Sequence, residues 1–262
     1  MLQALGSLTG IGWRWIVFFT GLIVAWSLLF AMEADIATLR AYGDIDRSFW
    51  AVLCSTAAED VSYPALFAMW GLMSVAMMAP TAIPAFKTYD DLTHTEAADG
   101  FGLLSLIAGY GAAWLCFSVF ASGLQMLLTG NGVLDPTGRS TSAGLNAILL
   151  AAAGLYQFST LKDSCLSKCR APMMFFMAEW RDGAGGAFAM GLKLGAVCIG
   201  CCWALMLVGF IGGIMNLLWM GLAMVLMAVE KLPAIGQRIT RPVGFTLVLA
   251  ACWAASQSLG FF

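Results

Sequence analysis

The 262-residue chain is 61% hydrophobic and only 11% charged, whereas soluble domains average about 25% charged residues. Its net charge of −2 provides no basic field, so we expect no nucleic-acid partner. The single histidine, His94, excludes bis-His haem and His-rich zinc or di-iron sites built from this chain alone. The composition therefore predicts an integral membrane protein whose first partner is the lipid bilayer.

Apolar segments of about 20 residues are long enough to cross a bilayer as helices. We predict seven in chain order: 13–32, 64–86, 101–128, 143–160, 187–210, 214–229 and 243–262. Pro80 and Pro84 are expected to kink or end the second. Because the sixth segment is short, six spans plus a re-entrant helix is the alternative. The predicted fold is all-α, a polytopic transmembrane bundle forming a single domain over residues 1–262.

Lysine and arginine residues are distributed unequally over the two sides of this bundle. With seven spans, nine fall on the side of the N-terminus and three on the opposite side. The positive-inside rule then places the N-terminus in the cytoplasm and the C-terminus outside, in a bacterial inner (plasma) membrane. The segment 13–32 is interpreted as a retained helix, because it is long for a signal peptide and no A-x-A cleavage site follows it.

Three of the eight cysteines lie inside the fifth segment, within one stretch of five residues, 198–202. Cys198, Cys202 and Met206 are spaced i, i+4, i+8 and share one face of a helix, and Cys201 flanks that face. Thiolates and thioethers are the ligands that select Cu(I) and other soft ions. The alternative is that small polarizable side chains pack well between helices.

A second pair, Cys165 and Cys169, follows the fourth segment beside Lys162, Lys168 and Arg170. The i, i+4 spacing puts both thiols on one helix face, which suits metal capture and dithiol redox chemistry equally. The alternative is two unused thiols near a basic patch for lipid headgroups. One four-cysteine site requires the segment 165–176 to fold back into the bundle; otherwise there are two separate sites, as a relay would need.

Other residues are candidates for supporting roles. Met77 belongs to a methionine repeat on the second segment and is an auxiliary ligand in the metal hypothesis; such repeats are more often core packing. Gln157 and Lys162 are polar residues near the Cys165 pair. Asn216 lies near the start of the sixth segment, and Glu230 and Lys231 close it, where they could form a simple interfacial pair. The G-x-x-x-G spacings at 191/195 and 209/213 predict close helix contacts.

Several motifs follow one another in a fixed order along the chain. They are Trp70-x-x-Met73-x-x-Ala76-Met77-Met78-x-Pro80, Gly109-Tyr110 with Trp114, Tyr156-Gln157, Lys162, Cys165-Leu-x-x-Cys169-Arg170-x-Pro172, Gly200-Cys201-Cys202-Trp203-x-Leu-Met206, Met215-Asn216, Trp219-Met220 and Glu230-Lys231. This arrangement resembles a bacterial family of uncharacterised, predicted metal-binding integral membrane proteins. The resemblance covers about residues 64–232, the expected metal-site core, and implies a bound metal without saying which.

The leading hypothesis is a membrane protein that handles a transition metal, copper as Cu(I) first and zinc second. The ion would lie between Cys165/Cys169 and Cys201/Cys202, with Met206 and Met77 as auxiliary ligands. Transport, sequestration and delivery to a metalloenzyme client or membrane complex are all open. The alternatives are a membrane thiol–disulfide or metal-dependent oxidoreductase and a structural subunit of a larger complex. We assign no catalytic residue.

Overall fold

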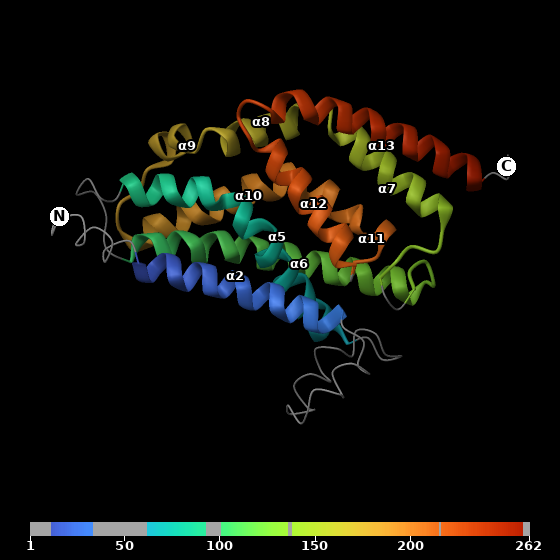
Figure 1. The fold of residues 1–262 in the computed structure, drawn as a ribbon, viewed down its shortest axis with the longest axis horizontal. Coiled ribbons are helices and arrows are strands. Elements are labelled where there is room, and N and C mark those ends of the chain that lie inside the picture. Colours follow the sequence, from blue (N-terminus) through green and yellow to red (C-terminus); the bar gives the residue numbers. More distant parts are fainter. Residues whose placement is uncertain (1–11, 34–61, 93–100, 136–137, 215, 259–262) are drawn as a thin grey trace.

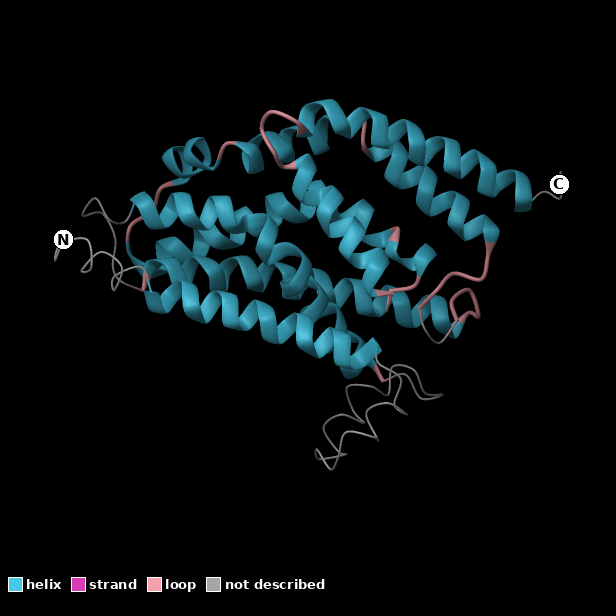
Figure 2. Cartoon of the chain, in the orientation of Figure 1, coloured by secondary structure: helices cyan, strands magenta, loops and turns pink. Residues whose placement is uncertain are grey.

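The computed structural model describes residues 12–33, 62–92, 101–135, 138–214 and 216–258. These residues form helices joined by turns, and none of them forms a strand beyond one isolated bridge between Leu134 and Ser140 (Figure 2). The predicted all-α class is therefore confirmed. His94 and the acidic segment after residue 33 lie outside the described residues, as does Met215.

The helices follow one another along the chain from α2 to α13 (Figure 1). Their bounds are α2 (Gly12–Glu33), α5 (Tyr63–Leu92), α6 (Gly102–Gly130), α7 (Ala143–Tyr156), α8 (Thr160–Arg170), α9 (Pro172–Glu179), α10 (Gly183–Leu207), α11 (Gly209–Gly212), α12 (Leu217–Glu230) and α13 (Gly236–Ser258).

Five of the described helical segments are long and apolar enough to cross a membrane: α2, α5, α6, α10 with α11, and α13. The helices α7 and α8 make a sixth only if they count as one span, and they are bent by 63°. The helix α12 has 14 residues, about 21 Å at 1.5 Å per residue, shorter than a bilayer core of about 30 Å. The described helices thus fall below the seven predicted spans and lie closer to the six-span alternative. They are compatible with a multi-pass membrane protein.

The helices α2, α5, α6 and α10 lie alongside one another, and α7 packs against α13 on the other side of the molecule (Figure 1). The helix α12 runs obliquely between these groups and contacts α5 and α13. The helices α6 and α10 approach each other closely. A Cβ added at Gly195 would lie 2.6 Å from that of Ala113, and one at Gly191 would collide with the Leu106 carbonyl oxygen. The predicted close contact at 191/195 is confirmed.

The second G-x-x-x-G prediction, at 209/213, is wrong. A Cβ at Gly209 would meet nothing within 4 Å. Gly213 has a φ of 92°, which an L side chain rarely adopts, so this glycine serves the turn between α11 and α12 rather than a helix contact. Two glycines at helical spacing do not distinguish these roles, because one of them lies beyond the helix end.

The prolines of α5, Pro80 and Pro84, each remove one backbone hydrogen bond without ending the helix, which continues to Leu92. Pro80 has no N–H for the carbonyl of Ala76 four residues earlier. The indole Nε1 of Trp26 on α2 donates to that carbonyl instead, at 3.1 Å. The carbonyl that Pro80 leaves without a helical donor therefore binds α2 to α5.

Candidate metal centre

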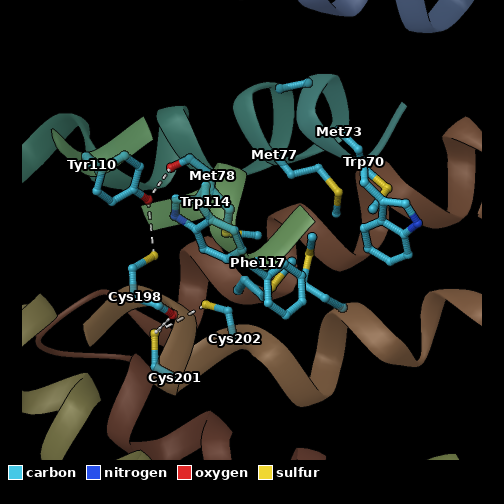
Figure 3. Close-up of a cluster of buried hydrophobic side chains, with 14 of the residues drawn as sticks. Trp70, Met73, Met77, Met78, Tyr110, Trp114, Phe117, Cys198, Cys201 and Cys202 are labelled. Atoms are coloured by element: carbon cyan, nitrogen blue, oxygen red, sulfur yellow. Dashed lines mark hydrogen bonds between the residues drawn. The ribbon is translucent and has the colours of Figure 1, made fainter. Parts of the chain in front are cut away.

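The central part of α10 carries three buried thiols that converge. Cys198, Cys201 and Cys202 are at most 2% exposed, and their sulfur atoms all lie within 4.8 Å of one another. The sulfurs of Cys201 and Cys202 are 3.2 Å apart (Figure 3). Spacings of three and four residues bring these side chains to one face of the helix, as the sequence predicted. We call these residues the thiol trio.

The helix α8 brings the second cysteine pair to the same place. Its 63° bend from α7 turns α8 onto α10, against which it packs. The sulfur of Cys165 lies 2.7 Å from where a Cβ at Gly200 would stand, so this glycine makes room for the thiol. The thiol of Cys169 interacts with that of Cys201. Both half-buried thiols of α8 therefore lie beside the trio, while the three thiols that converge within 4.8 Å of one another are those of α10.

A cationic and a phenolic group surround Cys198. Lys231 Nζ donates hydrogen bonds to the Cys198 sulfur at 3.0 Å and to Thr81 Oγ1 at 2.6 Å. The Tyr110 hydroxyl lies 3.1 Å from the same sulfur and 3.2 Å from the Met78 carbonyl oxygen (Figure 3). Because Lys231 is only 9% exposed, its charge is poorly screened by water and favours negative charge on the adjacent sulfur.

A cavity of about 240 Å³ lies between α5, the end of α8, α10 and the end of α12. Cys169 and Cys198 are both in its wall, together with Lys231 and the Tyr110 side chain. No carboxylate lines it. Its full lining is Pro80, Thr81, Ala82, Pro84, Ala85, Tyr110, Cys169, Arg170, Pro172, Leu194, Cys198, Ala228, Lys231, Leu232 and Pro233. The two thiols share this space with the hydroxyls of Thr81 and Tyr110 but with no carboxylate among the described lining residues, which suits a soft ion better than a hard one.

Buried charges hold α8 against the end of α12. Lys162 Nζ lies 2.8 Å from Glu230 Oε2, and both side chains are 1% exposed. Arg170 Nε donates to the Glu230 carbonyl oxygen at 2.9 Å. Glu230 and Lys231 are consequently not an interfacial pair as first interpreted. Both are buried, and each binds a different element: Glu230 binds α8, and Lys231 binds α5 and α10.

The other residues predicted to support the site are two methionines, Gln157 and Asn216. Met206 and Met77 are buried in the apolar cluster that includes the trio. Gln157 ends α7 and is 2% exposed, and neither atom of its amide has a hydrogen-bond partner. Asn216 is exposed and caps α12, accepting a bond of 3.0 Å from the Trp219 N–H. This cap explains Asn216 without a metal, and it stands at the opposite end of α12 from Lys231.

Sequence reasoning missed two groups at this site. Thr81 was not singled out, and Tyr110 was named only as part of the family resemblance. The hydroxyl of Tyr156 also donates to the carbonyl of Gly200, which attaches the end of α7 to the helix of the trio. A polar residue within an apolar segment was the available signal, since such a group needs an internal partner.

Comparison with known families agrees with this geometry. Residues 67–254 match the PpoB2 family, which is described as copper chaperone. No curated protein and no solved structure matches the chain. The matched segment contains the thiol trio, Cys165, Cys169 and Lys231, and it covers well over half of the 262 residues. The chain therefore belongs to the copper chaperone family.

Proposed function

We propose that this protein binds Cu(I) with the thiol trio and the Cys165/Cys169 pair and delivers it to a client metalloenzyme or membrane complex. The observation that carries the proposal is the convergence of the three buried thiols of α10, with the thiols of α8 packed beside them. Thiolate ligands select soft ions, and Cu(I) is the soft ion that agrees with the family. Zinc has no comparable support.

Charge balance supports a monovalent ion. Cu(I) held by two thiolates carries one net negative charge, which the Lys231 ammonium beside Cys198 would neutralise. An uncompensated charge in a buried site is costly. Zn²⁺ with two thiolates would be neutral, which would leave the charge of Lys231 itself uncompensated. The remaining thiols can stay protonated until copper moves onto them.

The arrangement of the thiols suggests a direction of movement. Cys165 and Cys169 are half-buried, whereas the trio is buried. Copper would be accepted by the α8 pair and then shared with Cys201, next to which Cys169 lies. Each new copper–sulfur bond releases one thiol proton to water, and the oxidation state of copper does not change.

We place this activity in a bacterial inner membrane. The long apolar helices are compatible with a membrane-spanning arrangement. The distribution of lysine and arginine favours a cytoplasmic N-terminus and an external C-terminus. Fusion of a reporter active on only one side of the membrane to each terminus would test this orientation.

The first test is metal content after anaerobic purification in detergent, by inductively coupled plasma mass spectrometry. Wild type is compared with Cys165→Ser/Cys169→Ser and with Cys201→Ser/Cys202→Ser. Cys116→Ser/Cys252→Ser, at exposed cysteines outside the cluster, is the control. Stoichiometric copper lost in both cluster variants would indicate one shared site, and partial loss from each would indicate two.

Wild type that contains no copper and takes up none when reconstituted with Cu(I) would refute the proposal. The 3.2 Å contact between the Cys201 and Cys202 sulfurs would then favour a dithiol redox role. Thiol titration in buffers of graded redox potential would measure that role directly, because a redox pair loses two thiols on oxidation without any metal.

A further inference from the structure

The helix α9 is attached to the bundle by one face. Phe175 and Phe176 are buried, and the Phe176 ring centroid lies 5.5 Å from that of Tyr89 on α5. At the end of α9, the Glu179 carboxylate pairs with Lys193 of α10. These contacts fix the rotation of the helix, so its opposite face is held outward.

The outward face is a cluster of methionines. Met173, Met174 and Met177 are 46%, 67% and 71% exposed, and they are the large apolar side chains that α9 exposes. Spacings of three and four residues put Cβ atoms about 5–6 Å apart. Because methionine side chains are long and flexible, the three thioethers can converge on one ion. We call this the methionine face.

The methionine face lies next to the thiol site. Only Ala171 separates α8 from α9, and Met173 is four positions after Cys169, at most about 14 Å of extended chain. Pro172, the first residue of α9, and Cys169 both line the 240 Å³ cavity that reaches Cys198. The three methionines are not in the wall of this cavity, so an ion held by them would be near it along the chain rather than inside it.

We propose that Met173, Met174 and Met177 form a second, weaker Cu(I) site that receives copper at the surface and passes it to Cys169. This inference rests on the proposed function. Thioethers are neutral, so they bind Cu(I) without losing protons, and thiolates then draw the ion inward by ligand exchange. Copper stays Cu(I), and the proton of the accepting thiol goes to water.

The test replaces the thioethers while preserving apolar volume, in Met173→Leu/Met174→Leu/Met177→Leu. Leu-for-Met exchanges are well tolerated, so packing against a membrane is retained. Met126→Leu, at an exposed methionine of α6, is the control. Full-length protein is mixed with a Cu(I)–chelator complex in stopped flow. We expect transfer to the thiols to slow by about tenfold in the triple variant, with unchanged copper stoichiometry.

A second measurement reads the site directly. Wild type labelled with ¹³C at the methionine methyl groups is titrated with Cu(I) beyond the equivalents that the thiols take up. The resonances of Met173, Met174 and Met177 should shift and that of Met126 should not. Unshifted resonances together with wild-type transfer rates would overturn the inference and leave the methionine face as an apolar surface. Absence of thiol-bound copper would instead refute the proposed function, and the methyl titration would still report on this site.

Discussion

Lys231 places an ammonium group 3.0 Å from the Cys198 sulfur and 2.6 Å from Thr81. In Lys231→Met, a copper–dithiolate unit would retain an uncompensated charge in a buried place. We expect the affinity for Cu(I) to fall by about 10–100-fold, as is typical when a group supporting metal ligands is removed. Competition against a colorimetric Cu(I) chelator measures this affinity.

Lys87→Met is the matched control, because Lys87 is an exposed lysine of α5 and is not among the residues that line the cavity at Cys198. Its affinity should equal that of wild type. Equal losses in the two variants would mean that Lys231 acts through overall charge or folding rather than through the thiols.

At the scale of single residues, the sequence predicts which cysteines share a helix face better than it predicts what surrounds them. The i, i+3, i+4 pattern of Cys198, Cys201 and Cys202 already implies one helix face. Tyr110 and Cys198 are separated by 88 residues. Their contact depends on how closely α6 and α10 approach and how each is rotated, which spacing within either segment does not specify. Lys231 was likewise predicted to pair with Glu230, because the sequence shows only that the two residues are adjacent.

The contact between α6 and α10 is an element-scale feature with a testable cost. In Gly191→Ala, the new Cβ would collide with the Leu106 carbonyl oxygen, forcing the helices apart and separating Tyr110 from Cys198. We expect a loss of about 1–3 kcal/mol in the free energy of unfolding and reduced copper content. Thermal unfolding in detergent and metal analysis measure these effects.

Gly111→Ala serves as the control for that substitution. It lies on α6 but a Cβ there would meet nothing within 4 Å, so replacing glycine in a helix should be neutral or slightly stabilising. If Gly191→Ala were equally stable, the α6–α10 approach would not depend on the missing side chain.

The ion pair between α8 and α12 makes a second element-scale prediction. Lys162→Met leaves the Glu230 carboxylate, 1% exposed, without its cation, and we expect a loss of about 3–5 kcal/mol of stability. Lys162→Met/Glu230→Leu removes both charges and should recover part of that loss. Thermal unfolding of the two variants decides the matter, and a double variant less stable than the single one would contradict the expectation.

The long helices were predictable from the sequence, and the breaks between them were less so. Hydropathy predicts α5, α6 and α10, because each of these helices is a long run of apolar residues. The segment 143–160 was predicted as one span, yet α7 ends at Tyr156 and α8 begins at Thr160. The Ser159 side chain accepts from the Lys162 N–H at 3.1 Å as an N-cap, a start signal that the apolar count overrode. The packing of α8 against α10, which brings Cys165 beside Gly200, follows from this break.

At the scale of the whole molecule, copper binding should be visible as stability. A ligand that binds the folded state alone stabilises it by about 2.7 kcal/mol at a concentration 100 times its dissociation constant. Anaerobic addition of Cu(I) should raise the Tm of wild type and of Cys116→Ser/Cys252→Ser. Differential scanning fluorimetry of Cys201→Ser/Cys202→Ser should show no rise, and an equal rise would place the bound ion elsewhere.

The approach of Cys169 to Cys201 also has a topological consequence. An ion held by both sulfurs would close the chain between α8 and α10 into a loop that contains all of α9. Cross-links over loops of 15 to 100 residues restrict the unfolded chain by about 3–5 kcal/mol. Bound copper would thus also cross-link α8 to α10. Each release of copper would remove that cross-link from the part of the molecule that a recipient has to approach.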